Sequence, residues 1–149
     1  MILAIDPGTT ESGWVEFEGG RVLASGVSNN YELVMKLVGH PAQRLVIEMI
    51  ASYGMPVGKE VFETCVWIGR FIAAYGRPLS NMHDYFAYRK DVKLHLCGTS
   101  KAKDGNIRQA LIDRIGPQGT KANPGPTYGV KSHAWAALAV AVTASETKS

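Results

Sequence analysis

Two acidic residues lie where the sequence is otherwise apolar. Asp6 ends the run "ILAI" and precedes a Pro-Gly turn, and Glu48 lies inside the run "LVIEMI". An ionised carboxylate in such surroundings is costly to bury unless a cation or a donor compensates its charge. Each acid alone has an ordinary explanation, because Asp6 can bond its own turn and Glu48 can pair with a basic residue such as Arg44 or Lys93. Together, at the ends of neighbouring strands, they indicate a divalent-metal site, since hard cations prefer carboxylate oxygens.

The strands that must position these acids are short and early in the chain. Strand patterns cover the segments 2–6, 13–20, 21–27, 44–50 and 77–81. Turn residues separate the first three, with Gly19 and Gly20 between the second and the third, so we expect an antiparallel meander. The fourth is rich in β-branched residues, which is typical of a strand buried on both faces.

Helix patterns alternate with the later strands. Apolar residues at helical spacing predict helices over the segments 31–39, 58–75, 89–96, 103–116 and 132–144, with a Gly- and Pro-rich loop before the last. Strands first, followed by alternating helices and strands, predict an α/β fold. The length of 149 residues predicts one domain over 1–149.

The composition is that of an ordinary globular protein. Hydrophobic residues make up 46% of the chain and charged residues 19%. No stretch approaches the roughly 20 apolar residues that a membrane span needs, and the N-terminus has no signal-peptide pattern, so we expect a cytoplasmic protein that contacts no membrane. Cys65 and Cys97 lie far apart without metal-type spacing, and we expect both to be reduced packing residues.

Charge is distributed unevenly along the chain. Residues 1–63 contain four Lys or Arg against eight Asp or Glu, whereas residues 64–149 contain twelve against five. The second half is therefore the one that would face a polyanion such as DNA. On composition alone, a solvated basic surface explains the same imbalance.

Three segments together resemble a known family. "AIDPGTTESGW", "LVIEMI" and "GVKSHAWAALAVAV" follow one another in the order seen in the RuvC family of Holliday junction resolvases, in the form carried by bacteriophages, within the ribonuclease H-like superfamily. The resemblance implies a five-stranded mixed sheet, its first three strands antiparallel, with helices on both faces. It also implies a homodimer that nicks two strands of four-way branched DNA, with no organic cofactor. In a host cell infected by such a phage, the protein would act in the cytoplasm.

The resemblance assigns the catalytic and metal-binding residues. Asp6 and Glu48 would be the first two ligands, and His133 matches the position of a third. Two divalent ions, Mg²⁺ or Mn²⁺, would activate a water and stabilise the leaving 3′ oxygen, which leaves 5′ phosphate and 3′ hydroxyl ends. With unperturbed pKa values near 4, the carboxylates would be ionised at neutral pH. As a ligand in place of an acid, His133 would favour Mn²⁺ over Mg²⁺.

The last helix departs from the family pattern. Relatives carry an Asp one helical turn after the position of His133, but here that residue is Ala136. Three interpretations stay open: three protein ligands suffice, another acid such as Asp113 or Asp104 substitutes, or the chain carries an inactivating substitution. His133 can also be a plain helix N-terminal residue after Ser132 as the N-cap.

Ala136 also keeps other functions open. A catalytically weakened protein could bind DNA junctions without cutting them. A nuclease that acts on other branched or RNA-containing structures is a further alternative.

Contacts with DNA are expected from short polar segments and one loop. The basic candidates are Arg89, Lys90, Lys93, Lys101, Lys103 and Arg108. In the loop "ASYGMPVGK", Tyr53 is the candidate for stacking on an opened base, with Met55 second, although a surface tyrosine there is equally ordinary. Ser12 can donate to phosphate or, as we favour, hold the turn after Asp6. The helix face with Val61, Cys65, Ile68 and Ile72 can supply a dimer contact, by resemblance, or the core of the fold.

Overall fold

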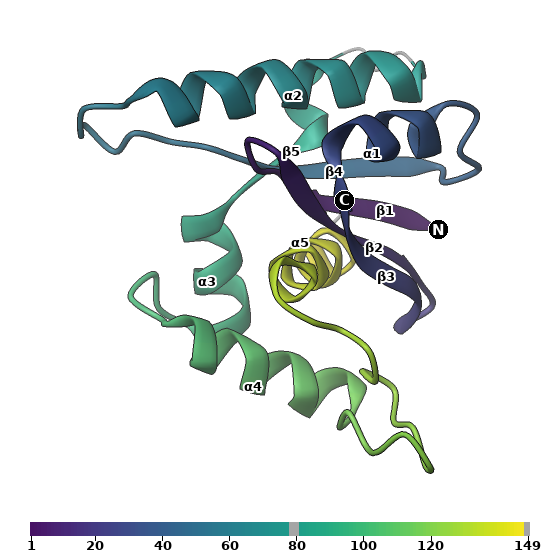
Figure 1. The fold of residues 1–149 in the computed structure, drawn as a ribbon. Helices are drawn as coiled ribbons and strands as arrows, with labels where there is room; N and C mark the ends of the chain where they lie inside the picture. Colours follow the sequence, from purple (N-terminus) through teal and green to yellow (C-terminus); the bar gives the residue numbers. More distant parts are fainter. Residues whose placement is uncertain (78–80, 148–149) are drawn as a thin grey trace.

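The computed structural model describes residues 1–77 and 81–147 and contains one mixed sheet (Figure 1). Its strands are β1 (Ile2–Asp6), β2 (Glu11–Glu18), β3 (Arg21–Asn29), β4 (Arg44–Met49) and β5 (Phe86–Tyr88), in the order β3-β2-β1-β4-β5. The pairs β1–β2 and β2–β3 are antiparallel, whereas β4 is parallel to both β1 and β5. The predicted five-stranded mixed sheet with an antiparallel first half is therefore confirmed.

The hairpin between β2 and β3 depends on two glycines. Gly19 and Gly20 have φ values of 59° and 78°, both in the left-handed region. Two consecutive left-handed residues give the tight turn whose twist matches that of the flanking strands. The predicted meander therefore forms where the sequence places this Gly-Gly pair.

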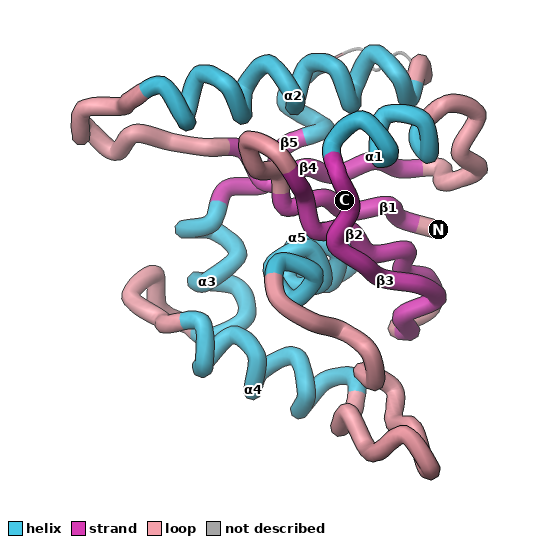
Figure 2. The backbone as a smooth tube through the Cα atoms, in the orientation of Figure 1, coloured by secondary structure: helices cyan, strands magenta, loops and turns pink. Residues whose placement is uncertain are grey.

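Helices cover both faces of the sheet (Figure 2). On one face lie α1 (Asn30–Leu37) and α2 (Lys59–Tyr75). On the other lies α5 (His133–Thr147), with α3 (Arg89–Cys97) and α4 (Asp104–Ile115) packed beyond it. Because α5 lies between the sheet and the pair α3 and α4, it is apolar on nearly all sides.

Alternation along the central strands decides which side chains meet which helices. Leu3 and Ile5 belong to the core on the α1 and α2 side, whereas Ala4 belongs to the core around α5. Successive side chains of a strand point to opposite faces, so Asp6 faces α5 like Ala4. Val46 in β4 faces α5 in the same way, and Glu48 follows it two residues later. Both acids therefore lie on the α5 face of the sheet.

The fifth strand differs from the prediction. Residues 78–80 of the expected strand 77–81 lie outside the described residues. The strand that pairs with β4 is Phe86–Tyr88, which follows a 3-10 helix over Met82–Tyr85. Three half-buried residues are too few to show a period of two, so the sequence pattern gave no signal for it.

Two further expectations concern packing. On the α2 face with Val61, Cys65, Ile68 and Ile72, Ile68 is buried and Ile72 packs against the cluster between the sheet and α2, so these two residues serve the core. Cys65 and Cys97 are free, half-buried thiols as predicted.

Within 1–77 and 81–147, no helix combines the length and apolar character needed to cross a membrane.

Candidate active site

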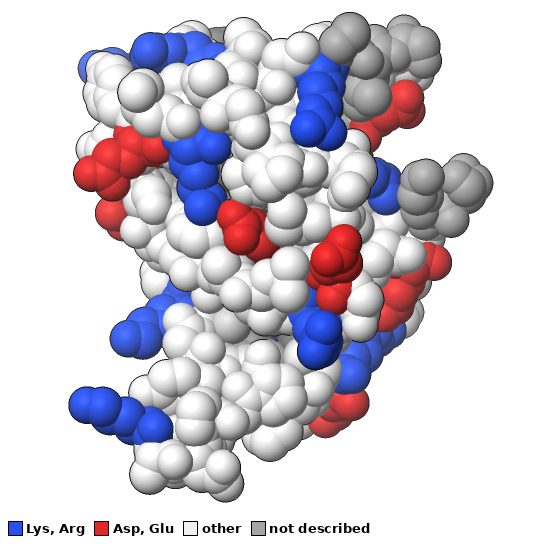
Figure 3. Space-filling view, turned by 90° about the vertical axis from the view of Figure 1, so that its right-hand side faces the viewer, with Lys and Arg blue, Asp and Glu red and all other residues white. Residues whose placement is uncertain are grey.

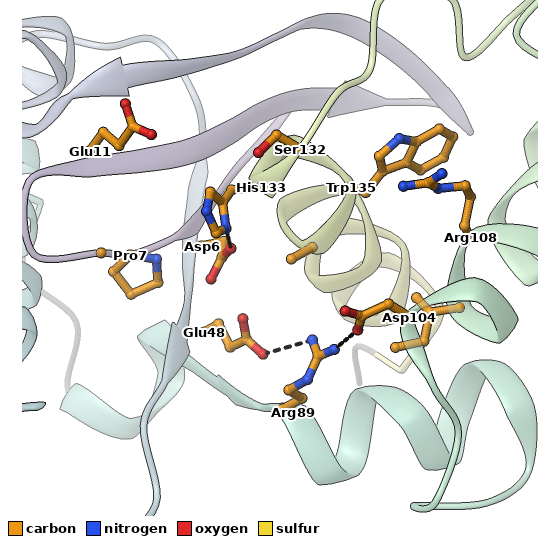
Figure 4. A pocket seen from close by; sticks show the side chains of 13 residues that line it. Asp6, Pro7, Glu11, Glu48, Arg89, Asp104, Arg108, Ser132, His133 and Trp135 are labelled. Carbon is orange, nitrogen blue, oxygen red and sulfur yellow. Dashed lines mark hydrogen bonds and ion pairs between the residues drawn. The ribbon is translucent and has the colours of Figure 1, made fainter.

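Asp6 and Glu48 meet at the carboxyl ends of two neighbouring parallel strands. Ile5 of β1 pairs with Ile47 of β4, and the two acids follow directly after this pair. They open into a pocket of about 520 Å³ that is also lined by residues of α3, α4 and α5 (Figure 4). The crevice beyond the carboxyl ends of parallel strands is the usual ligand site of such sheets. The strand ends therefore bring together the two acids that the sequence singled out.

The two carboxyl groups strongly influence each other's ionisation. Burial raises the pKa of Glu48 to about 8, the negative charge of Asp6 adds to the rise, and Arg89 opposes it. Burial also raises the pKa of Asp6. The expectation of ordinary pKa values near 4 is wrong, because it ignored burial and the second carboxylate.

The raised pKa of Glu48 has a consequence for stability. Unfolded Glu48 ionises near its ordinary pKa, whereas the folded protein holds the proton until about pH 8. The metal-free fold therefore loses stability as pH rises between these values. We expect Glu48→Gln, which stays neutral, to raise the free energy of unfolding by roughly 2–4 kcal/mol at pH 9 and to leave it unchanged at pH 4. Urea unfolding in chelator at both pH values measures this, and an equal difference at both would contradict it.

Arg89 is the cation that faces this pair. Its Nη1 lies 3.6 Å from Oε1 of Glu48, and its Nη2 donates to Oδ1 of Asp104 at the start of α4. One guanidinium therefore links two carboxylates from different elements. Of the partners suggested for Glu48, Arg44 instead donates to the carbonyl of Ala144.

His133 reaches the site because a glycine lets its helix approach. His133 Nδ1 lies 3.1 Å from Oδ2 of Asp6. Gly13 is the β2 partner of Asp6, and a Cβ at Gly13 would lie 2.3 Å from the backbone carbon and oxygen of His133. Any side chain there would push the start of α5 away from the sheet. Ser132, expected as an N-cap, has a left-handed φ of 50° rather than the extended backbone typical of that position.

A buried network fixes the turn that follows Asp6. The Gly8 amide donates to Ser12 Oγ at 3.1 Å, and Ser12 Oγ donates to Asn30 Oδ1 at 2.6 Å. Asn30 Nδ2 closes the ring by donating to the Gly8 carbonyl at 2.9 Å. Ser12 and Asn30 are almost completely buried. Ser12 therefore holds the turn, as favoured from the sequence, and its partner Asn30 was not anticipated.

The donor set suits a hard cation, although the side chains are not gathered as a finished ligand cage. Among the described residues, no group of three or more His, Cys, Asp or Glu side chains is arranged to hold a metal ion. Asp6 and Glu48 nevertheless converge on one pocket, and a cationic guanidinium already lies against Glu48. Two carboxyl groups that line one pocket from neighbouring strands offer the oxygen ligands that a divalent cation prefers.

The two acids considered as substitutes for the acid missing at Ala136, Asp104 and Asp113, lie in different places on α4. Ala136 and Asp104 both line the pocket, from α5 and from α4. Asp113 lies further along α4, where it accepts a hydrogen bond from Gln109 Nε2 at 2.8 Å. Asp113 is not among the residues that line the pocket.

No family model matches the chain, and no curated protein matches it. Two solved structures of Thermus thermophilus RuvC match the chain. Each match covers 97% of this chain and 92% of the RuvC chain. The first has a TM-score of 0.66 at 21% identity. The second, RuvC in complex with a Holliday junction substrate, has a TM-score of 0.69 at 19% identity. The chain has the RuvC fold.

On this RuvC fold, the basic residues predicted to bind DNA form two groups. Arg89 and Arg108 line the pocket, and the Arg108 guanidinium lies over the ring of Trp135, 5.2 Å from its centroid. The others lie on α3 and on the approach to α4, where all except the half-buried Lys93 are exposed: Lys90, Lys93, Lys101 and Lys103. By contrast, the face seen in Figure 3 mixes Lys and Arg with Asp and Glu.

Tyr53 lies in the loop between β4 and α2. Its side chain is 62% exposed and its backbone is left-handed, with φ of 50°. In Figure 1 this loop and the loop between α3 and α4 project on the same side of the RuvC fold. Met55 in the same loop is also exposed. Both side chains are thus free to meet a partner.

Some site residues had no recognisable signal in the sequence. Trp135 reads as one more apolar residue of a buried helix, yet it forms a wall of the pocket. Arg89 was assigned to DNA, and its pairing with Glu48 depends on where β5 ends. Gly13 had a possible signal, since glycine inside a strand often marks a close backbone approach.

Proposed function

We propose that this chain is a metal-dependent endonuclease that nicks four-way DNA junctions in pairs. The observation that carries the proposal is the pair Asp6 and Glu48, placed at adjacent strand ends in the pocket of a RuvC fold. Support also comes from the RuvC structure of the same fold, which is in complex with a Holliday junction substrate.

Each residue then has a defined task. Asp6 and Glu48 would hold the divalent cations, with His133 beside Asp6 as a further ligand. The chemistry that such cations supply is activation of a water and stabilisation of the leaving 3′ oxygen. The Ser12 and Asn30 network keeps the turn after Asp6 in place, so that the carboxylate needs no rearrangement when a phosphate arrives.

The remaining candidates would bind the arms of the junction. Arg89 and Arg108 would contact phosphates next to the cut, and the exposed lysines of α3 and of the loop before α4 would contact phosphates further away. Tyr53 would stack on an opened base at the branch point. These contacts position the DNA without reading its sequence.

Nicking of a labelled four-way junction tests this function. We expect paired nicks with 5′ phosphate ends in Mn²⁺, slower cutting in Mg²⁺, and none in chelator, because an imidazole ligand suits Mn²⁺ better than Mg²⁺. A linear duplex of the same sequence is the control. Equal cutting of duplex and junction would contradict structure-specific recognition.

Ala136 favours a second candidate, a protein that binds junctions without cutting them. Its methyl group offers no ligand at a pocket-lining position. Tight junction binding with no nicking in either metal ion would support this alternative over the nuclease.

Paired nicking requires two sites, and we propose that α1 and α2 supply a homodimer contact. Exposed apolar side chains lie on both helices: Tyr31, Met35, Phe62 and Val66. The helices are joined there by Tyr31 and Trp67, whose ring centroids are 4.8 Å apart. An apolar surface of this kind on a globular protein marks an interaction site.

A charge placed in this surface is expected to separate the subunits. Phe62→Glu with Val66→Glu should give a monomer in sedimentation velocity and convert paired nicks into single ones, because burying two carboxylates at the contact is costly. Met82→Glu, an exposed apolar residue before β5, is the matched control. A dimer that survives the double substitution would place the contact elsewhere.

Junction binding is expected to weaken steeply with salt, since Lys and Arg release counterions from phosphates. Replacing Lys101 and Lys103 by Gln should reduce the slope of log Kd against log salt by roughly two. Arg21→Gln, at the start of β3 and outside the pocket lining, is the control. Fluorescence anisotropy at 50–300 mM salt, roughly the range where such contacts dominate, measures the slope. An unchanged slope in the double variant would remove these lysines from the DNA surface.

A further inference from the structure

Besides Asp6 and Glu48, two carboxylates line the pocket, Glu11 and Asp104, and Asp104 is one of the acids considered above as a substitute ligand. Asp104 is the first residue of α4, and it faces the strand ends across the pocket (Figure 4). Its side chain is 86% exposed, so packing does not explain its place. An acid in the first turn of a helix also complements the helix dipole, and this ordinary role has to be separated from a ligand role.

Arg89 shows that Glu48 and Asp104 can hold one positive charge between them. The guanidinium contacts Oε1 of Glu48 on one side and Oδ1 of Asp104 on the other. Its two terminal nitrogens belong to one rigid planar group, so the two carboxylates must lie close to each other. The negative charge of Asp104 also contributes to the raised pKa of Asp6. Asp6, Glu48 and Asp104 therefore line the same pocket, although among the described residues they are not gathered as a ligand set.

Helix α5 lines the pocket at Ala136 but provides no acidic side chain there. Ala136 lines the pocket one turn after His133, and its side chain ends at a methyl group. Asp104 lines the same pocket from the start of α4. An acid on α4 can thus supply the negative charge that α5 does not.

We propose that Asp104 is a ligand of the divalent-metal site and replaces the acid absent at Ala136. The inference rests on the proposed function. Arg89 lies between Glu48 and Asp104 in the metal-free protein, and a divalent cation competes with it for the same oxygens. Asp6 and Glu48 supply carboxylates from the strands, and Asp104 adds one from α4.

Mn²⁺ binding by the whole protein without DNA tests the ligand role directly. Calorimetric titration should show an Mn²⁺ dissociation constant raised about tenfold or more by Asp104→Asn, because a charged oxygen ligand is lost. Asp113→Asn, on the same helix outside the pocket, should change it less than about twofold. Wild-type affinity in Asp104→Asn would overturn the inference. If Asp6→Asn also binds Mn²⁺ like the wild type, the proposed metal site itself fails.

Two further comparisons separate a ligand from a mere partner of Arg89. In an Arg89→Met background, Asp104→Asn should still weaken Mn²⁺ binding about tenfold; loss of the effect would mean that Asp104 acts only through Arg89. Adding Ala136→Asp to Asp104→Asn should restore the dissociation constant to within about threefold of the wild type, since a carboxylate returns to the pocket from α5. Failure of this rescue in a variant with wild-type circular dichroism would also count against the inference.

Discussion

Replacing Asp6 by Asn or Glu48 by Gln is expected to reduce junction cleavage roughly a thousandfold or more while the junction dissociation constant changes less than about tenfold. Each substitution removes a charged oxygen ligand from the proposed metal site, and neither removes a Lys or Arg that contacts phosphate. Single-turnover nicking with saturating protein measures the chemical step, and fluorescence anisotropy in Ca²⁺ measures affinity.

Glu32→Gln is the matched control, because Glu32 is an exposed acid in the first turn of α1. It should cut like the wild type. Cleavage by the Asp6→Asn variant within about tenfold of the wild type would remove the catalytic role of the strand-end acids. A parallel loss of affinity and cleavage would instead mean that the acids organise DNA binding.

Gly13→Val is expected to have the second large effect. A Cβ at this position would lie 2.3 Å from the backbone of His133, and backbone atoms of a packed helix cannot give way like the end of a flexible side chain. The start of α5 must therefore move away from Asp6. We expect a loss of stability of about 3 kcal/mol and a fall in cleavage of roughly a hundredfold, since reacting groups tolerate little displacement.

Gly69→Ala in α2 is the control for this glycine. A Cβ there meets nothing within 4 Å, so the change should be neutral or slightly stabilising. Thermal unfolding and single-turnover nicking measure both variants. If Gly13→Val keeps wild-type stability and cleavage, close approach of α5 to β2 is not what places His133.

The sequence was sufficient where a residue's own neighbours decide the structure. Short apolar runs rich in β-branched residues indicated the central strands, a Gly-Gly pair indicated the hairpin, and two acids in these runs indicated where the pocket lies. The strand Phe86–Tyr88 was not predicted from the sequence. It pairs with β4, which is far away in the chain, and its three residues are too few to show the alternation of a strand. The bacteriophage form and the cytoplasmic location stay predictions from the sequence.

The ionisation and ion pairing of the site residues could not be predicted from the sequence for a related reason. The pKa of Glu48 depends on burial and on the distance to Asp6, and both arise only when β1 and β4 pair. Arg89 pairs with Glu48 because β5 ends beside β4, which spacing along the chain does not reveal. Residue types thus indicated the candidate groups for the chemistry, whereas their protonation and partners needed the fold.

The contact between His133 and Asp6 joins residues 127 positions apart, and this separation has a consequence during synthesis. At about 5–20 residues per second, a ribosome makes His133 roughly 6–25 s after Asp6. In that interval the nascent chain has its strand-end acids but no imidazole beside them, and the α5 face of the sheet is uncovered. Docking of α5 therefore both covers this apolar face and brings His133 to the strand-end acids, so under the proposed function a nascent chain would gain nuclease activity only in the step that completes its fold.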